Sequence, residues 1–584
     1  MSPPPATASW TGWHVLSDPI DPSQQTDLPF GMRSYWLQPW RAYLDTPPAS
    51  VLRDAVGINF NVPPSQAAST AALLAQSGFK LARLEVGWSA MSYSDPSQLA
   101  DPASLDTMLT ALKDNGIRPL ILLNANDGDP GPSQSFEADI TEPAAAGARS
   151  VQVDPATAAQ IVPGLSGFNV PGGPAVAFIV TSVSASGVAT LSQPLPAAIP
   201  AGQYAATTLR YGPFASPFTA GGQPNPAFEQ TLAGWLQYVR AVTTEARNVL
   251  GADGFDVEIW NELSFGSDFL DVSNYYNPVP PSLQGTGSVD DELLARTVQW
   301  LRDPANGVSA IGIGDGFADQ TPFVSGATVP AGVTAIDKHP YNGGLHQFPQ
   351  DATQSVYTQS GIRPVNALGQ PAGADLAGTW LDDFTPSFTA LFPEYYLSGL
   401  QTEFMERDLS PITTTIGGVP HGRDVAPPGQ STPPQVWITE TNIDPTGSGL
   451  TNPADLANLQ AKAALRTLAA FVNKGVSRVY FYAATGSPFG MIDPGAPGGG
   501  ETMTAIGRFM TAFAGPDTIA TRRSLSLLKI GDQGNWAQFA GNDTAAYPPL
   551  YNRDVVAFLP FQTNSNLFVI PVYLMTRDIA TVYY

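Results

Sequence analysis

The stretch that decides the fold, residues 80–123, reads KLARLEVGWSAMSYSDPSQLADPASLDTMLTALKDNGIRPLILL. Each end of this stretch is a short apolar run typical of a buried strand. Between the two runs, apolar side chains recur at the i, i+3, i+4, i+7 spacing of one helix face, at Leu105, Met108, Leu109 and Leu112. A strand, a helix and a second strand in this order predict a βαβ unit, and therefore a parallel sheet.

The same alternation extends along most of the chain. A helix is predicted over 228–250, and strands are predicted over 56–60, 80–86, 117–123, 255–260, 323–325, 335–338, 436–439 and 478–482. Eight βα units over roughly 460 residues predict an α/β fold of the (β/α)8, or TIM barrel, type with long loop insertions. A doubly wound open sheet is the alternative, which the lack of a Gly-rich phosphate loop after the first strand disfavours.

Two regions interrupt this alternation. Residues 130–215 contain short β-like segments with frequent Pro and Gly, which predicts a small β insertion after the third strand. Helical patterns end near residue 515, so residues 515–584 are predicted to form a C-terminal β-sandwich domain. Residues 1–50 are expected to pack with that domain and to contribute strands to it. The barrel itself would then span 51–514.

Composition excludes several function classes. The 584 residues include 27 Lys and Arg against 50 Asp and Glu, which gives a net charge of −23 that would repel nucleic acid and anionic lipid. Cysteine is absent, so disulfides, thiolate metal sites and thiol nucleophiles are excluded. No membrane helix is expected, and the first residues lack the pattern of a secretory signal. The compartment stays open.

Acidic and polar residues follow several of the predicted strands, at the barrel end where TIM-barrel active sites lie. Glu262 follows the fourth strand, Glu440 ends the seventh, and the sixth is followed by His339 and Tyr341. Two carboxylates on strands four and seven would lie across the barrel mouth from each other. Glycoside hydrolysis needs such a pair, one to protonate the leaving oxygen and one to attack or to activate water.

Other residues near these strand ends have two interpretations. Arg83 would keep a nucleophilic carboxylate ionised, or it would be a structural arginine paired with Glu85. His339 would bind substrate or would close a loop. The aromatic residues would stack on sugar rings or would belong to the core; they are Trp88, Trp260 and Trp437.

A metal site is not expected. Residues 126–129 offer oxygen ligands but lack the spacing of a calcium loop. The four histidines are scattered along the chain, and none of them forms a helical zinc pair. The Gly-x-Ser-x-Gly elbow of many serine hydrolases is also missing. The chemistry is therefore expected to need no cofactor.

Two segments carry a family resemblance. Glu258-Ile259-Trp260-Asn261-Glu262-Leu263 resembles the Asn-Glu signature of the clan A retaining glycoside hydrolases. Val436-Trp437-Ile438-Thr439-Glu440-Thr441-Asn442 resembles the strand-seven nucleophile segment of the same clan. The layout, a barrel with a β-sandwich joined by N-terminal strands, is similar to glycoside hydrolase family 39, which includes β-xylosidases, α-L-iduronidases and exopolysaccharide endoglycosidases.

The resemblance implies a retaining glycosidase in which Glu262 is the acid/base, Glu440 the nucleophile, and Asn261 the contact to the sugar 2-hydroxyl. The residues expected to bind substrate are Arg83, Trp88, Asn126, Asn261, His339, Tyr341, Trp437 and Tyr482. The sequence departs from the family pattern at Leu263, where proline is usual, and at Phe481-Tyr482, where many members have tryptophan. The sugar and its linkage are therefore left open.

The expected function is hydrolysis of an oligo- or polysaccharide in carbohydrate metabolism. A transglycosylase and a non-catalytic carbohydrate-binding protein on a hydrolase-like barrel are the alternatives. A third is a structural or assembly component, in which the β insertion or the β-sandwich would mediate homo-oligomer formation. The connection 342–435 is expected to form one wall of the site. A closed wall would make a pocket for exo cleavage, and an open wall would make a cleft for endo cleavage.

Overall fold

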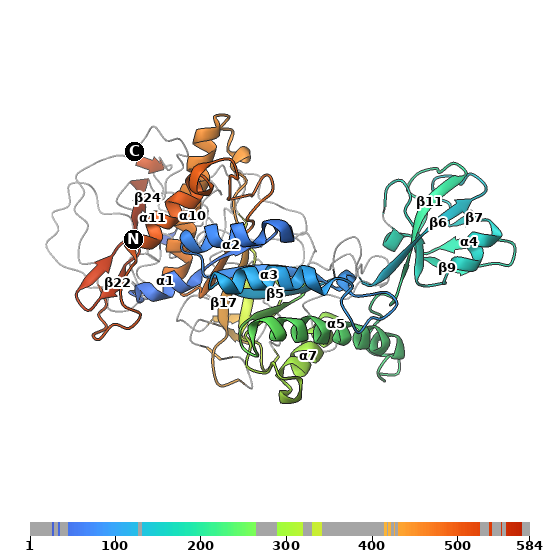
Figure 1. The fold of residues 1–584 in the computed structure, drawn as a ribbon, viewed down its shortest axis with the longest axis horizontal. Coiled ribbons are helices and arrows are strands. Elements are labelled where there is room, and N and C mark those ends of the chain that lie inside the picture. Colours follow the sequence, from blue (N-terminus) through green and yellow to red (C-terminus); the bar gives the residue numbers. More distant parts are fainter. Residues whose placement is uncertain are drawn as a thin grey trace. The chain divides into compact units, whose positions relative to one another are not determined.

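The structure described here is a computed structural model (Figure 1). It contains a closed parallel barrel of eight strands, in the order β12-β13-β14-β17-β18-β3-β4-β5. The strands are β3 (Val56–Asn59), β4 (Leu81–Gly87), β5 (Arg118–Asn124), β12 (Asp256–Ile259), β13 (Ile313–Gly314), β14 (Ala335–Lys338), β17 (Gln435–Thr441) and β18 (Arg478–Phe481). The predicted (β/α)8 barrel is confirmed.

The structure describes residues 45–125, 131–173, 175–263, 289–318, 330–341, 430–525 and 557–574, together with a few residues and short strands elsewhere. Several predictions concern residues outside this part of the chain, among them the substrate contact at Asn126 and nearly all of the wall at 342–435.

The barrel strands are buried on both faces, as expected for a parallel sheet covered by helices. All four residues of β3 and of β12 are buried. The fifth strand differs from its predicted position, because β13 lies at Ile313–Gly314, where it pairs with Val257 and Glu258 of β12. Residues 323–325, where this strand was expected, lie outside the described residues. Two strand residues within the Gly-rich sequence IGIGDG have the pattern of a turn, which explains the difference.

Helices follow most of the strands. Helix α1 (Ala49–Ala55) leads directly into β3, and the helices that come later are α2 (Ala67–Gln76), α3 (Pro102–Asp114), α5 (Pro226–Leu250), α7 (Val289–Arg302), α10 (Pro453–Asn473) and α11 (Glu501–Ala512). The ends of α5 show how local sequence sets the bounds. Asn225 caps its N-terminus by accepting a hydrogen bond from the Ala227 backbone, and Gly251, with φ of 90°, ends it. Its apolar stripe, including Leu232, Trp235 and Val239, is buried.

The β insertion forms a lobe of two three-stranded sheets, ordered β7-β10-β9 and β6-β11-β8. Its elements are β6 (Ser133–Ile140), β7 (Ser150–Gln152), α4 (Pro155–Gln160), β8 (Ser166–Phe168), β9 (Val180–Val183), β10 (Val188–Leu191) and β11 (Gly202–Leu209). The lobe has a hydrophobic core of its own, which includes Phe168, Phe178 and Leu191. Strands β6 and β11 pair along their whole length, so the chain enters and leaves the lobe at one point.

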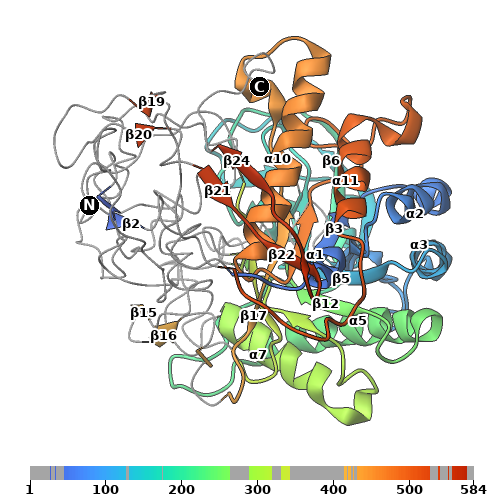
Figure 2. The same cartoon turned by 90° about the vertical axis from the view of Figure 1, so that its left-hand side faces the viewer.

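The described part of the C-terminal region contains three antiparallel strand pairs, β19–β20, β21–β24 and β22–β23, and the β-sandwich domain over 515–584 stays a prediction. The strands are β19 (Ala537–Phe539), β20 (Leu550–Tyr551), β21 (Val556–Phe558), β22 (Phe561–Asn564), β23 (Leu567–Val569) and β24 (Val572–Leu574). Strand β22 contacts α1 (Figure 2). Strand β24 contacts α10 through Tyr573, whose ring centre lies 4.7 Å from the guanidinium carbon of Arg466.

Residues just before the barrel join this tail. Gln562 donates its backbone N–H to the Pro47 carbonyl over 2.9 Å, and Leu525 donates to the Thr46 hydroxyl over 3.1 Å. A short antiparallel pair, β1 (Thr26–Asp27) and β2 (Arg33–Ser34), precedes them. The rest of the first 44 residues, and the packing predicted for them, lies outside the described residues.

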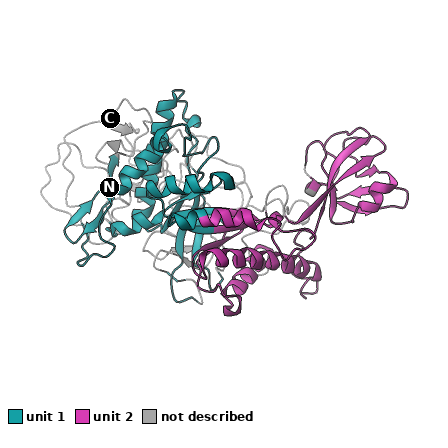
Figure 3. Ribbon diagram, viewed as in Figure 1, with its two compact units in different colours: residues 1–84, 111–120, 318–584 teal, residues 85–110, 121–317 magenta. Residues whose placement is uncertain are grey.

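The chain divides into two compact units, 1–84 with 111–120 and 318–584, and 85–110 with 121–317 (Figure 3). The division runs through β4 and β5, so both units contribute strands to the barrel. In the part of the chain that the structure describes, none of the helices combines the length and apolar character of a membrane span.

Candidate active site

Glu440 occupies the end of β17, where the strand is irregular. The pairing of β17 with β18 shifts register between Ile438 and Thr441, which marks a β-bulge. Trp437, earlier in the strand, packs in a cluster of barrel residues that includes Leu81 and Tyr480. A bulge changes the direction in which the following side chains point, and bulges are frequent beside active sites. The irregularity therefore sets the direction of the Glu440 carboxylate.

Three side chains of the same unit surround the Glu440 carboxylate. Arg83 Nη1 lies 2.6 Å from Oε1, and the Tyr341 hydroxyl donates to Oε2 over 2.6 Å. His339 Nδ1 lies 3.8 Å from Oε2. Arg83 comes from β4, while His339 and Tyr341 follow β14. The structure thus brings four of the predicted residues together, and it selects Glu440 rather than Glu85 as the partner of Arg83.

The electrostatics of this group favour an ionised Glu440. Burial opposes ionisation, but the charge of His339, the Arg83 guanidinium, and hydrogen bonds from Tyr341 and Arg83 outweigh it and hold the pKa of Glu440 below its ordinary value. The carboxylate is therefore negatively charged at neutral pH and fixed in orientation by two donors. Those are the properties that a nucleophilic carboxylate needs.

Asn59 and Thr439, which sequence reasoning missed, hold these residues in turn. The Asn59 amide accepts from Arg83 Nη1 over 2.9 Å and donates to the carbonyls of Thr439 and Phe481. The Thr439 hydroxyl lies 3.0 Å from His339 Nε2. The available signal was an Asn at the end of an apolar strand, which by itself is weak.

Three aromatic rings lie together beside this carboxylate. The ring of Tyr341 is 6.4 Å from that of Tyr482 and 5.7 Å from that of Phe489. Asn442 donates to the carbonyls of Tyr482 and Phe489 over 2.7 and 2.9 Å, which fixes the chain after β18. Tyr482 was predicted as a substrate contact, whereas Phe489 was not predicted.

Glu262 belongs to the other unit, where it follows β12, and both it and Asn261 are half-buried. The backbone there is unusual, because Trp260 and Glu262 have φ of 72° and 53°, in the left-handed region that non-glycine residues rarely adopt. Gly316 contacts this turn so closely that a Cβ would lie 1.7 Å from the Ile259 carbonyl oxygen. Leu263 donates its N–H to the Gly316 carbonyl over 2.9 Å.

Two of the predicted sugar-stacking residues, Trp88 and Trp437, are buried in the core. The ring of Trp88 stacks on Tyr211 and meets Trp235 edge-on. Trp437 is covered by Arg478, whose guanidinium carbon lies 4.0 Å from the ring centre. Both side chains are 1% exposed or less, so neither presents a face to a substrate. Trp260 is buried as well, against Trp235.

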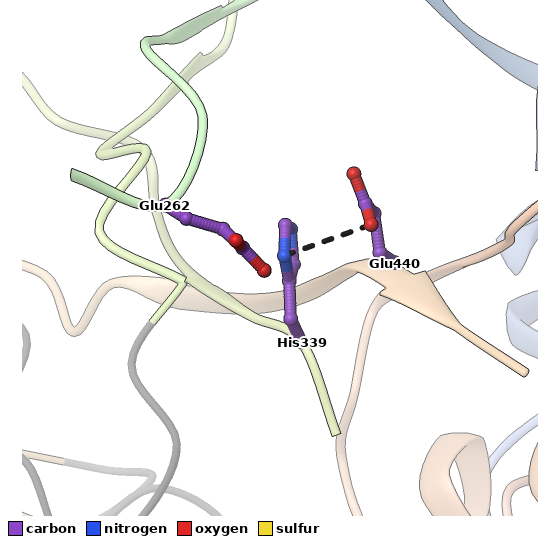
Figure 4. Close-up of side chains that lie close together, drawn as sticks. All are labelled: Glu262, His339 and Glu440. Carbon is purple, nitrogen blue, oxygen red and sulfur yellow. Dashed lines mark ion pairs between the residues drawn. The ribbon is translucent and has the colours of Figure 1, made fainter. Parts of the chain in front are cut away.

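Figure 4 shows Glu262, His339 and Glu440, each of which offers one ligand atom within 4.8 Å of those of the other two. Two carboxylates and an imidazole would suit a divalent cation. The Arg83 guanidinium, however, already places a positive charge 2.6 Å from Glu440. A second cation beside it would be repelled, so the group fits proton transfer and nucleophilic attack better than metal binding.

Comparisons with known proteins add a likeness of fold. No family model matches the sequence, and no curated protein matches it. One matching solved structure is a family 39 glycoside hydrolase from Bacteroides cellulosilyticus WH2, at 13% identity and a TM-score of 0.39, covering 80% of this chain and 65% of that one. An exo-β-1,4-mannosidase from Opitutaceae bacterium strain TAV5 matches at 14% identity and 0.37, covering 78% and 59%.

A third match is a GH5-4 broad-specificity endoglucanase from an uncultured bacterium, at 10% identity and a TM-score of 0.39, covering 80% of this chain and 96% of that one. The chain thus spans less than two thirds of the length of the first two. The closed barrel places the chain in the class of TIM-barrel proteins.

Proposed function

We propose that this protein is a retaining glycoside hydrolase in which Glu440 is the nucleophile and Glu262 the acid/base. The observation that carries the proposal is the buried Glu440 carboxylate, whose pKa is lowered and whose oxygens accept hydrogen bonds from Arg83 and Tyr341. Glu262 follows another strand of the same closed barrel. Retention needs a separation of about 5–5.5 Å between the two carboxyl groups, rather than the roughly 6.5–9.5 Å of inversion.

The reaction would proceed by double displacement. Glu440 attacks the anomeric carbon while Glu262 gives its proton to the departing glycosidic oxygen, so one C–O bond forms as the other breaks. Glu262, now a carboxylate, then takes a proton from water as that water attacks the same carbon and releases Glu440. Arg83 and Tyr341 hold Glu440 in line for the first step. The ring faces of Tyr482 and Phe489 would pack against the sugar.

The first test is hydrolysis of a panel of aryl glycosides and polysaccharides by the wild type, Glu262→Ala and Glu440→Ala. Glu229→Gln is a matched control, because Glu229 pairs with Arg296 on the protein surface. We expect one sugar to be cleaved, with activity lost in both active-site variants and kept in the control. Activity that survives in Glu440→Ala would overturn the assignment of the nucleophile.

Azide distinguishes the two roles. In Glu440→Ala, azide takes the place of the missing nucleophile and gives a glycosyl azide of inverted configuration. In Glu262→Ala, azide attacks the glycosyl-enzyme in place of water and gives a product of retained configuration. Proton NMR of the first-formed product reads the configuration directly. The opposite pattern would exchange the two roles, and inversion by the wild type would exclude double displacement.

The same panel separates the alternatives. Products longer than the substrate would indicate a transglycosylase. Saturable binding of a glycan without turnover would indicate a carbohydrate-binding protein. The size of the products distinguishes exo from endo cleavage.

A further inference from the structure

The side-chain amide of Asn59 bonds to three other barrel strands, accepting a hydrogen bond through its oxygen and donating through its nitrogen. It closes β3, which lies between β18 and β4 in the barrel, and its side chain is buried. Its Oδ1 accepts from Arg83 Nη1 over 2.9 Å. Its Nδ2 donates to the carbonyls of Thr439 over 3.1 Å and of Phe481 over 3.3 Å. One amide therefore ties β4, β17 and β18 together.

One nitrogen of Arg83 serves two acceptors. Nη1 donates to Asn59 Oδ1 and to Glu440 Oε1, so its two hydrogens are divided between the amide and the carboxylate. The amide oxygen thus fixes the rotation of the guanidinium about its long side chain. Because Thr439 immediately precedes Glu440, the bonds of the same amide also fix the strand that carries the carboxylate.

The chemistry of this position requires an amide. An aspartate would turn an acceptor toward the two carbonyls, losing both donated bonds, and would place a second negative charge against Arg83. A leucine of similar shape would leave the Arg83 nitrogen without this acceptor. Only a side chain that accepts on one side and donates on the other satisfies all three neighbours.

We propose that Asn59 is a positioning residue, which aims Arg83 at Glu440 and sets the spacing between the cation and the strand that carries the nucleophile. The proposal rests on the function proposed above, but its central test does not require turnover. Asn59 itself touches neither of the two glutamates in the contacts described, so it acts through Arg83.

The charges that face Glu440 determine what a substitution should do. Arg83 approaches from β4, His339 and Tyr341 from the segment after β14, and Glu262 from the segment after β12. Asn59→Asp adds a carboxylate that competes for Arg83, the nearest cation. The pKa of Glu440 should then rise by about one unit, the lower end of the effect of one close charge.

Asn61→Asp is the matched control. Asn61 is two residues further along, exposed, and its amide bonds only to Thr485, over 2.7 and 3.1 Å. The substitution is chemically the same, and it adds the same charge to the same segment. It does not change the hydrogen bonds of Arg83.

The experiment measures the pKa of Glu440 in protein labelled with carboxyl-¹³C glutamate, assigned by the signal missing from Glu440→Gln. We expect Asn59→Asp to raise the pKa and Asn61→Asp to leave it in place. With active enzyme, the acid limb of kcat/KM should move up by about one pH unit in Asn59→Asp. Asn59→Ala should lower kcat by up to about a hundredfold with little change in KM.

A folded Asn59→Asp variant, with a Glu440 pKa and an acid limb equal to those of the wild type, would overturn the proposal. Should Asn59→Asp fail to fold, Asn59→Ala takes its place, with a raised Glu440 pKa expected and an unchanged one contradicting the proposal. An inactive wild type would count against the proposed function, while the titration would still decide the role of Asn59.

Discussion

The two glutamates of the proposed pair lie on different kinds of backbone, a strand for Glu440 and a left-handed turn for Glu262. Glu440, at the end of β17, is fixed through its side chain, by Arg83, Tyr341 and His339. Glu262, after β12, lies in a turn whose backbone is left-handed at Trp260 and at Glu262 itself. A nucleophile must stay charged and aimed, whereas an acid/base must exchange its proton twice in each turnover. The charges and hydrogen bonds around Glu440 suit the first role, and the left-handed turn fixes the main chain that carries the second glutamate.

The largest effect is expected from Arg83→Met, which removes the nearest cation from Glu440. Leaving a buried charge without its partner costs about 3–5 kcal/mol of unfolding free energy. Activity should fall by about a hundredfold to a thousandfold, as when one preorganised electrostatic group is removed. Urea unfolding at pH 7 measures the first loss. The double variant Arg83→Met/Glu440→Gln should recover part of the stability, and failure to recover would contradict a charge-based hold.

The sign of the pH dependence tests the same hold. Because the folded state lowers the pKa of Glu440, its contribution to stability is present above the unfolded value of about 4.3 and is lost as pH falls through the folded pKa. In Arg83→Met, the burial of Glu440 is opposed only by His339 and Tyr341, so the pKa of Glu440 should rise relative to the wild type. The stability that Glu440 contributes above its unfolded pKa should therefore be smaller in that variant, and the variant should lose less stability than the wild type as the pH falls from 5.

A smaller effect is expected from Tyr341→Phe, which removes one hydrogen bond to a charged acceptor. Such a bond contributes about 1.5–3 kcal/mol. The pKa of Glu440 should rise and the acid limb of kcat/KM should move upward. Tyr204→Phe is the control, since the Tyr204 hydroxyl donates only to a backbone carbonyl in the β insertion. An unchanged acid limb would mean that Tyr341 does not help to hold the charge.

The left-handed backbone at Glu262 predicts that glycine and alanine variants have opposite orders of stability at Glu262 and at Glu440. With φ of 53°, Glu262→Gly should be about 1 kcal/mol more stable than Glu262→Ala, because the left-handed region strains residues with a Cβ. At Glu440, which lies in a strand, glycine should instead be less stable than alanine by about 0.5–1 kcal/mol. Urea midpoints of the four variants decide this. The same order of stability at both positions would contradict the difference in backbone between Glu262 and Glu440.

The smallest effect concerns a carboxyl pair outside the barrel mouth. A hydrogen bond with Asp106 raises the pKa of Glu245, opposite to the direction at Glu440. Glu245 therefore contributes stability that is full below its unfolded pKa and is lost as pH rises through the folded pKa. Asp106→Asn should reduce this dependence slightly. Stability of the variant and the wild type between pH 4 and 7 measures it, and parallel curves would contradict the pairing.

The sequence allowed the barrel and the charged centre of the site to be predicted. Strand patterns located seven barrel strands within a few residues, and strand ends identified Glu440, Arg83, His339 and Tyr341, which the structure brings together. The fifth strand was missed because two residues are too few for a pattern.

Long-range packing explains most of the rest. Asn59 bonds to Thr439 across 380 positions, and no local pattern indicates such a partner. Buried and sugar-binding tryptophans look alike in sequence, so Trp88 and Trp437 could not be separated from substrate contacts. The left-handed turn at Glu262 has no glycine to mark it. The β-bulge in β17 had no signal either, although strict alternation would have pointed Glu440 to the other face.

The β insertion has a consequence for how this protein could acquire and exchange parts. Its first and last strands are hydrogen-bonded neighbours, from Ser133 opposite Leu209 to Ile140 opposite Gly202. A module whose ends already touch can be spliced into a surface loop with little entropic cost to the host, because the loop stays closed. If the two ends of this segment were linked to each other, it would be a cyclic polypeptide that keeps its own hydrophobic core. Recombination could therefore add or remove the lobe as one unit, without interrupting any strand of the barrel.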